Sequence, residues 1–207
     1  ELGNFSEENL RPFSDGNHGL TIPPGSISVC TYQAQDKLSF EDYNCESGGA
    51  LFNDFAALLG KDGDTDAKTE QKIKDVLGSA TKTKEGFVYF ERTGFDHLTV
   101  DEAHNFKNLF TLPRPSKKDK NAPKRQANEF NGIGAGNPSN RALKMFAMTQ
   151  LVQEKNNNRN VFMLTATPFS NNPLEVYSML SYVGREALRE RHIYNLYDFC
   201  AQYADCR

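Results

Sequence analysis

The sequence predicts an α/β fold in which a parallel sheet is flanked by helices. Short apolar, β-branched runs alternate with longer amphipathic stretches along the 207 residues, a pattern typical of strands joined by helical crossovers. The run at 161–165 is apolar throughout, as expected for a strand buried on both faces of a parallel sheet. The stretch at 139–155 has the periodicity of an amphipathic helix, and Ser139 is a candidate N-cap.

The composition excludes several classes of protein. The formal net charge of −3 excludes a uniformly basic nucleic-acid binder. No apolar run approaches the roughly 20 residues of a membrane span, and no signal peptide is visible at the start. The four cysteines form no CxxC pair, which favours a reduced cytoplasmic protein with Cys30 in its core. Because the first residue is Glu1 rather than Met, we interpret the chain as a segment of a longer protein.

The first half of the chain is expected to hold short elements between polar loops. Residues 1–25 are rich in Asn, Ser, Pro and Gly and are predicted to form a loop. The elements expected after it are a strand at 27–32, a helical continuation at 33–40, an amphipathic helix at 48–59, a solvated helix at 65–80 and a weak strand at 87–90.

The second half is expected to alternate strands and helices around a long loop. The segment at 114–125 carries six basic residues against one Asp, a local net charge of +5. It is either a contact with phosphate backbones or a solvated insertion. The other elements expected here are a strand at 97–100, a helix at 139–155, a strand at 161–165, a helix at 174–183 and a last helix at 192–204.

Two adjacent carboxylates, Asp101 and Glu102, directly follow the strand at 97–100. Ligands of open α/β sheets bind at the carboxyl ends of strands, where successive side chains point in different directions. One acid can therefore face a metal while its neighbour faces an attacking water, which is the division of tasks that phosphoryl transfer needs. The alternative is a plain strand end with solvated carboxylates.

A second segment, VFMLTATP at 161–168, delivers two hydroxyls to the same sheet edge. Thr165 and Thr167 can hydrogen-bond the acids, or couple the state of a bound phosphate to a moving loop. A Thr-Pro pair alone occurs in many turns, so this segment gains its meaning from the first one.

Together and in this order, the two segments resemble the first motor domain of superfamily 2 helicases and translocases, a RecA-like fold of the P-loop NTPase type. DEAH at 101–104 resembles the Walker B motif, and LTATP at 164–168 resembles motif III. Further stretches are similar to Snf-like translocases, as in large phage, plasmid and conjugative-element proteins that also carry an adenine methyltransferase domain. These stretches are VCTYQA at 29–34 (motif Ib), NFKNL at 105–109 and FSNNPLE at 169–175.

The resemblance implies ATP and Mg²⁺ as cofactors of the full-length protein. Asp101 would hold Mg²⁺ through water, Glu102 would polarise the attacking water, and His104 would link the nucleotide site to motif III. Thr165 and Thr167 would transmit that state. The nucleic-acid contacts expected from the resemblance and from the basic loop are Thr31, Ser170, Lys117, Lys118, Lys120, Lys124 and Arg125.

One departure from the family pattern is the lack of a Gly-rich P-loop ending in Gly-Lys-Ser/Thr. The only Gly-Lys pair, at 60–61, is followed by Asp62, and the Gly-rich stretch at 132–136 has no Lys. We therefore expect the P-loop and its strand upstream of Glu1, and the second motor domain beyond Arg207. The strand at 161–165 would then lack one neighbour, so its edge should be covered by residues 1–25 or by a second copy of the chain.

The expected organisation has three parts. A polar segment at 1–25 precedes the C-terminal part of a RecA-like ATP-binding domain at 26–184, which carries a basic loop at 113–138 and lacks the P-loop strand. Residues 185–207 begin an inter-domain helical region. The leading function is part of an ATP-driven motor acting on double-stranded DNA, inactive as this segment alone, although the residues do not distinguish DNA from RNA.

Two alternatives stay open at this point. One is a degenerate motor fold without a P-loop, serving as a DNA-binding or scaffold module. The other is a different Mg²⁺-dependent phosphohydrolase that uses Asp101 and Glu102 and has further acids nearby.

Overall fold

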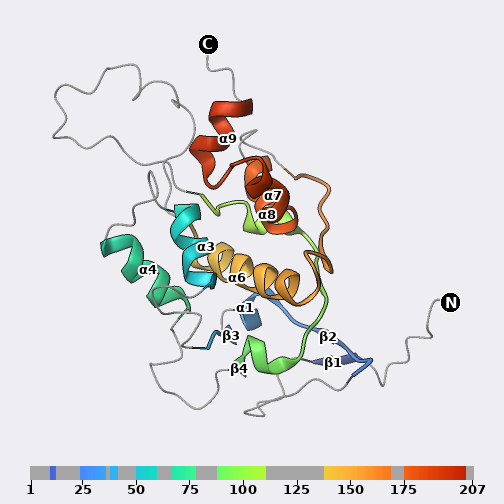
Figure 1. Ribbon diagram of the computed structural model, residues 1–207. Helices are drawn as coiled ribbons and strands as arrows, with labels where there is room; N and C mark the ends of the chain where they lie inside the picture. Colours follow the sequence, from blue (N-terminus) through green and yellow to red (C-terminus); the bar gives the residue numbers. More distant parts are fainter. Residues whose placement is uncertain are drawn as a thin grey trace.

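The computed structural model describes residues 10–12, 24–35, 38–41, 50–59, 67–77, 88–110, 138–168 and 175–203 (Figure 1). The strands are β1 (Leu10–Pro12), β2 (Ile27–Val29), β3 (Leu38–Ser39), β4 (Val88–Tyr89), β5 (Leu98–Val100) and β6 (Val161–Met163). The α-helices are α1 (Tyr32–Gln35), α3 (Ala50–Leu59), α4 (Ala67–Leu77), α6 (Asn140–Lys155), α7 (Glu175–Val183), α8 (Arg185–Glu190) and α9 (Leu196–Tyr203), and the 3₁₀ helices are η3 (Phe90–Thr93) and η4 (Ala103–Phe106).

Strands pair in parallel throughout the described residues, which confirms the predicted α/β class. The pairs are β1 with β2, β3 with β4, and β5 with β6. In the last pair Leu98 lies opposite Val161 and Val100 opposite Met163. The arrangement, a small parallel sheet flanked by helices, is compatible with part of a RecA-like fold.

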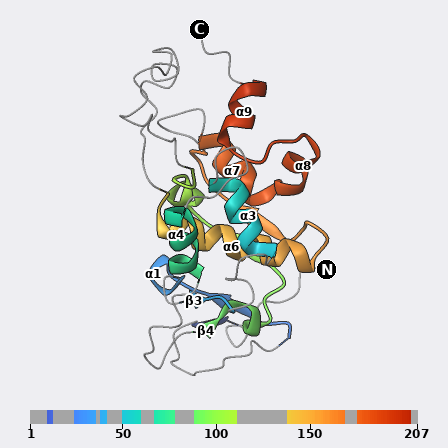
Figure 2. The ribbon, with the colours of Figure 1, turned by 60° about the vertical axis from the view of Figure 1, so that its left-hand side comes forward.

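Helix α6 forms the centre of the core, between helices α7–α9 and the strand pair β3–β4 (Figures 1 and 2). Its start is the predicted one, because the Ser139 Oγ accepts a hydrogen bond from the Ala142 amide at 3.1 Å. Its burial differs from the prediction of one apolar face: every residue from 142 to 153 is buried. Contacts from α3, α4, α7 and β6 explain this, with Phe146 packed edge-on against Phe55 of α3 at 5.1 Å between ring centroids.

Several expectations about the first half were wrong, beginning with residues 1–25: they were predicted to form a loop, but residues 10–12 form strand β1. Strand β2 ends at Val29, short of the predicted end, and α1 begins at Tyr32, whose ring packs edge-on against Phe106 at 5.3 Å between centroids. Residues 38–39 form a strand with β4 instead of continuing a helix. Cys30 is exposed rather than in the core, because β2 itself is largely exposed, with Val29 at 64%.

Helices α3 and α7 lie within the predicted ranges, whereas two other helices differ from expectation. Helix α4 is not fully solvated, since Ile73, Val76 and Leu77 are buried in the core. Helix α8 was not predicted as a separate element, and Gly184 separates it from α7. The last predicted helix is shorter than expected and corresponds to α9.

Strand β6 is not buried on both faces, which corrects the prediction for 161–165. Helices α6 and α7 pack against it, but Phe162 and Leu164 remain 52% and 50% exposed. Phe162 stacks on the His97 ring at 5.2 Å between centroids. Within the described ranges β6 pairs with β5 alone, and residues 10–12 pair with β2 instead of covering the β6 edge.

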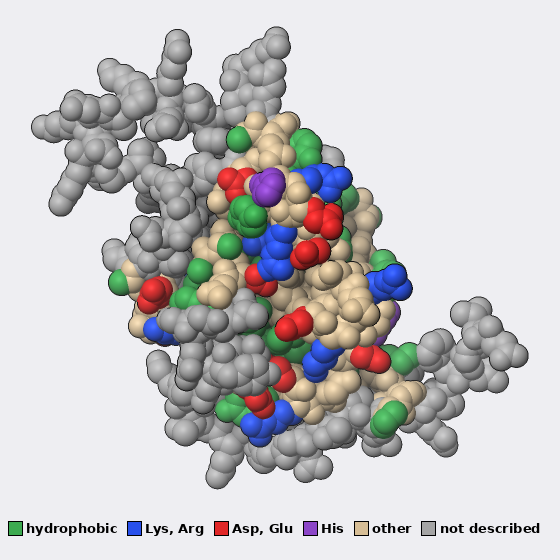
Figure 3. All heavy atoms as spheres, in the orientation of Figure 1, with side chains coloured by type: hydrophobic (Ala, Val, Ile, Leu, Met, Phe, Trp, Pro, Cys, Tyr) green, Lys and Arg blue, Asp and Glu red, His purple; other side chains and the backbone are tan. Residues whose placement is uncertain are grey.

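The surface and the helices agree with the composition. On the face seen in Figure 3, acidic and basic side chains are interspersed. None of the described helices is long and apolar enough to cross a membrane.

Candidate active site

The acids and the threonine of the two motifs lie at the carboxyl ends of adjacent parallel strands. Asp101 and Glu102 follow β5 directly, and Thr165 is the second residue after β6. Backbone hydrogen bonds continue the pairing past the strands: Leu164 N donates to Val100 O at 2.8 Å, and Ala103 N donates to Leu164 O at 2.9 Å. The two segments expected to meet are therefore joined at the ligand-binding edge of a parallel pair.

Residues 101–106, here called the acid turn, hold an unusual backbone conformation. Glu102 has φ 47° and ψ 47°, the left-handed region that side chains other than glycine rarely adopt. Two hydrogen bonds support it: the Glu102 amide donates to Asp101 Oδ1, and Asn105 Nδ2 donates to Glu102 O, both at 2.9 Å. Such conformations cost about 1–3 kcal/mol and cluster at active sites, so the strain marks Glu102 as a functional candidate.

His104 connects the acid turn to the segment after β6. Its Nδ1 lies 3.1 Å from Glu102 Oε2 and 3.5 Å from Thr165 Oγ1. Thr165 Oγ1 also accepts a hydrogen bond from the Thr167 amide at 3.1 Å. Glu102, His104, Thr165 and Thr167 thus form one connected chain of contacts, and their catalytic roles remain predictions.

The donor set fits a magnesium ion that arrives with a phosphate-bearing substrate. Asp101 and Glu102 are exposed and offer the oxygen ligands that Mg²⁺ prefers. The described residues contain no group of three or more His, Cys, Asp or Glu side chains that could hold a metal ion by themselves. Mg²⁺ is commonly bound by one or two carboxylates together with substrate phosphates and water, so this pair suits such a shared site.

Tyr32, which the sequence reasoning did not single out, contacts the acid turn from the VCTYQA stretch. Its hydroxyl donates a hydrogen bond to the backbone oxygen of Asp101. Burial raises the pKa of this hydroxyl, and the nearby charge of Asp101 raises the pKa further. The neighbouring Thr31 is exposed, so a ligand that binds to this residue would lie close to the acids. Tyr32 lies in the VCTYQA stretch that resembles motif Ib, and this was the sequence feature that could have pointed to it.

Tyr32→Phe is expected to lower the free energy of unfolding by about 1 kcal/mol, because it removes one hydroxyl–carbonyl hydrogen bond and keeps the ring. Urea denaturation of the chain would measure this change. Tyr203→Phe is the control, since Tyr203 is 59% exposed at the end of α9 and its loss of a hydroxyl should leave stability unchanged. Equal stabilities for the two variants would contradict the bond to Asp101.

Helix α7 holds the backbone at the end of the acid turn, at residues 106 and 107. Lys107 Nζ and Glu175 Oε1 form an ion pair at 3.2 Å, and their side chains are only 17% and 7% exposed. Ser178 Oγ donates to Lys107 O at 2.7 Å, and the Tyr182 hydroxyl donates to Phe106 O at 2.8 Å. Glu175, Ser178 and Tyr182 share one helix face, so three side chains hold two consecutive residues.

Both residues of the Lys107–Glu175 ion pair lie in stretches that resemble Snf-like translocases. Lys107 lies in NFKNL and Glu175 in FSNNPLE, but no local pattern indicates that these two residues pair. Burial raises the pKa of the Tyr182 hydroxyl well above its ordinary value, which keeps it a hydrogen-bond donor. Helix α7, which comes after the TATP segment in the sequence, therefore holds the chain that follows the acids.

The remaining predicted site residues are two exposed threonines and a set that lies outside the described ranges. Thr31 and Thr167 are exposed, and the Thr167 backbone amide donates to Thr165 of the connected chain. Ser170 and the basic-loop residues Lys117, Lys118, Lys120, Lys124 and Arg125 lie outside the described residues.

Comparisons with known proteins give a family and one distant relative. A family model described as a probable helicase domain matches residues 53–206, most of the chain. The chain is similar to the protein named "Defense against restriction protein B" of Escherichia phage P1, with 29% identity over 143 residues. That match covers 69% of this chain and 6% of the phage protein, so the chain spans a small part of its relative's length. No solved structure matches the chain.

Proposed function

The chain belongs to the family of probable helicase domains, and we propose that it is part of the first motor domain of an ATP-dependent translocase or helicase of the Snf-like, superfamily 2 type. The observation that carries this proposal is the contact of His104 with both Glu102 and Thr165 at one sheet edge. It supports DEAH as the Walker B motif and TATP as motif III, because coupling hydrolysis to movement needs a physical link between them.

Each residue of the site has a task in this proposal. Bound Mg²⁺ would neutralise phosphate charge, and Asp101 would hold the ion through water. Glu102 would accept a hydrogen bond from the attacking water and so orient it. His104 would hold the Glu102 carboxylate and respond when Thr165 moves.

Partners and location extend the proposal to the parent protein. We propose double-stranded DNA as the track, a cytoplasmic location, and a parent chain of a mobile genetic element that includes a methyltransferase domain. The similarity to a phage protein supports the mobile-element origin. The P-loop that ATP binding requires would be contributed by the parent protein outside this chain.

The alternatives differ from the motor in what surrounds the acids. A separate Mg²⁺-dependent phosphohydrolase needs further acids at the site. In the described residues the Glu102 carboxylate contacts His104, His104 contacts the Thr165 hydroxyl, and no group of three or more possible metal ligands is present. A degenerate scaffold would have no Gly-x-x-x-x-Gly-Lys-Ser/Thr in the parent gene. Finding that motif upstream would favour the motor over the scaffold.

The test of the proposed function is DNA-stimulated ATP hydrolysis by the intact parent protein. Asp101→Asn should abolish the stimulated rate, because it removes the carboxylate that would hold Mg²⁺. Asp96→Asn is the matched control: Asp96 is exposed at the opposite end of the same strand, and its described contacts use its backbone oxygen. An intact protein that hydrolyses no ATP with any nucleic acid would refute the motor.

Charge reversal in the basic loop is expected to weaken DNA binding and flatten its salt dependence. Each lost phosphate contact should reduce the slope of log K against log salt by roughly 0.9. The residues to reverse are Lys117, Lys118, Lys120, Lys124 and Arg125. Fluorescence anisotropy with a labelled duplex at several salt concentrations measures both quantities. Unchanged affinity and slope would mean that the loop is only a solvated insertion.

A further inference from the structure

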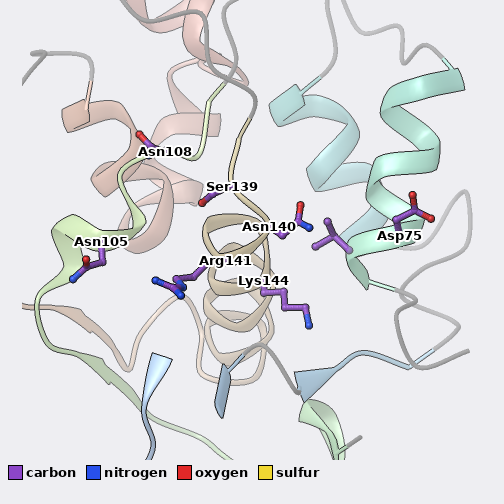
Figure 4. A pocket seen from close by; sticks show the side chains of 8 residues that line it. Asp75, Asn105, Asn108, Ser139, Asn140, Arg141 and Lys144 are labelled. Carbon is purple, nitrogen blue, oxygen red and sulfur yellow. The ribbon is translucent and has the colours of Figure 1, made fainter. Parts of the chain in front are cut away.

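A pocket of about 600 Å³ opens beside the acid turn, on the side of helices α4 and α6 (Figure 4). Three segments line it: the end of α4 with Asp75, the chain after the acids with Asn105 and Asn108, and the start of α6 with Arg141 and Lys144. In Figure 4 the Arg141 side chain extends towards Asn105. None of these residues belongs to the site predicted from the motifs.

The pocket lies at the ligand-binding edge of the parallel pair. Helix α6 connects β5 to the parallel strand β6, so its first residues lie near the carboxyl end of β5, as the acids do. The Ser139 amide donates to Asn108 O at 3.0 Å and fixes the helix start against the chain after the acid turn. The pocket and the acid turn are therefore adjacent and share Asn105.

The lining chemistry suits a phosphate group. Arg141 and Lys144 carry two positive charges against the single carboxylate of Asp75, and the asparagine amides add neutral donors. Lys144 is 7% exposed, and its Nζ donates to Leu38 O at 2.9 Å. Its ammonium group therefore adds positive charge to the pocket without being an accessible contact. Asp75 Oδ1 accepts a hydrogen bond from Gln71 at 2.9 Å. Arg141 is the more accessible of the two cations.

The donors are side chains and not the helix end itself. Ser139 caps α6 through its Oγ and its backbone oxygen, which accept from the Ala142 and Leu143 amides at 3.1 and 3.0 Å. A ligand in the pocket would thus be recognised by Arg141 and the amides. Arginine and amide side chains contact phosphates without reading base sequence.

We propose that this pocket binds a backbone phosphate of the nucleic acid, with Arg141 as the principal contact and Asn105 as the connection to the acid turn. The inference rests on the proposed function, since that function supplies the nucleic acid. Asn105 Nδ2 donates to Glu102 O, so a phosphate that engages this amide competes with the bond supporting the left-handed turn. Occupancy of the pocket would in this way reach Glu102 and regulate hydrolysis.

Duplex binding by the full chain tests the proposal, with the two arginines at opposite ends of the α6 region as a matched pair. Arg141→Gln should weaken the Kd about tenfold, the loss expected for one charge-assisted contact, and should reduce the salt slope by roughly 0.9. Arg159→Gln, an exposed arginine in the turn between α6 and β6, should change neither. The loss should be equal for two duplexes of unrelated sequence.

Further variants distinguish a loss of binding from a loss of folding. Arg141→Lys keeps the charge and should retain the salt slope. Asn108→Ala removes a neutral donor, so it should weaken binding and leave the salt slope unchanged. A melting temperature equal to that of the wild type shows that a variant is folded. An Arg141→Gln chain that binds as the wild type does overturns the pocket assignment, as does a wild-type chain with no affinity for duplex.

Competition identifies the source of the phosphate. Inorganic phosphate or ATP that displaces the duplex at low millimolar concentration from the wild type, but not from Arg141→Gln, would overturn the nucleic-acid assignment in favour of a free phosphate. The intact protein separates the two hypotheses. DNA-stimulated hydrolysis in both wild type and Arg141→Gln leaves the motor and removes the pocket's role, whereas no hydrolysis in the wild type removes the motor.

Discussion

Glu102→Gln in the intact parent protein is expected to lower the rate of ATP hydrolysis by about 10²- to 10⁴-fold, the usual contribution of a general base or water-orienting group. Nucleotide affinity should stay unchanged, because the amide is of equal size and the residue would contact the water and not the phosphates. A phosphate-release assay beside a nucleotide-binding measurement separates the two effects. Retained hydrolysis would show that Glu102 is not the residue that activates water.

Two controls accompany this substitution. Glu154→Gln changes an exposed glutamate near the end of α6, far along the chain from the acid turn, and should leave hydrolysis intact. The 207-residue chain alone should release no phosphate above its own Glu102→Gln variant, since it has no P-loop lysine to hold the β and γ phosphates. Turnover that depends on Glu102 in the chain alone would reveal an unrecognised phosphate site.

The left-handed backbone conformation of Glu102 permits a second test of this residue, by its effect on stability. Glu102→Gly should relieve backbone strain and raise the free energy of unfolding by roughly 1 kcal/mol, because glycine adopts this conformation freely. The same substitution should abolish hydrolysis. A residue that costs stability and is needed for activity would fit the view that strain is kept at functional sites.

Glu175→Ala is expected to destabilise the chain by about 3 kcal/mol, because it leaves the Lys107 ammonium in a mostly buried site without its carboxylate. For a chain of this size that loss should lower the melting temperature by roughly 6–12 °C. Thermal unfolding of the chain, followed by circular dichroism, would measure it. The effect is large because the pair is little exposed and belongs to the contact that holds residues 106–107.

A surface pair provides the comparison. Glu70 and Lys74 lie 4.0 Å apart on α4 with side chains 41% and 45% exposed, so Glu70→Gln should change stability by less than about 0.5 kcal/mol. Exchanging the charges, Lys107→Glu with Glu175→Lys, should recover part of the loss. If Glu175→Ala is no worse than Glu70→Gln, helix α7 does not hold the chain after the acid turn through this pair.

Local sequence patterns were enough to predict the features that depend on neighbouring residues. The periodicity of apolar side chains located α3, α6 and α7, and Ser139 located the start of α6, because capping and helix periodicity act over a few residues. The two acids after β5 and the hydroxyls after β6 were likewise readable, since strand ends follow from local composition. Their chemistry was assigned through the resemblance carried by DEAH and TATP.

Which of these features contact one another depends on the fold. Tyr32 and Asp101 are 69 residues apart, His104 and Thr165 are 61 apart, and Ser178 and Lys107 are 71 apart, so no local pattern joins them. The half-exposed face of β6, the burial of α6 on all sides and the pocket at Arg141 also depend on what packs nearby. An apolar residue signals that it can be buried, but only the neighbours brought by the fold determine whether it is.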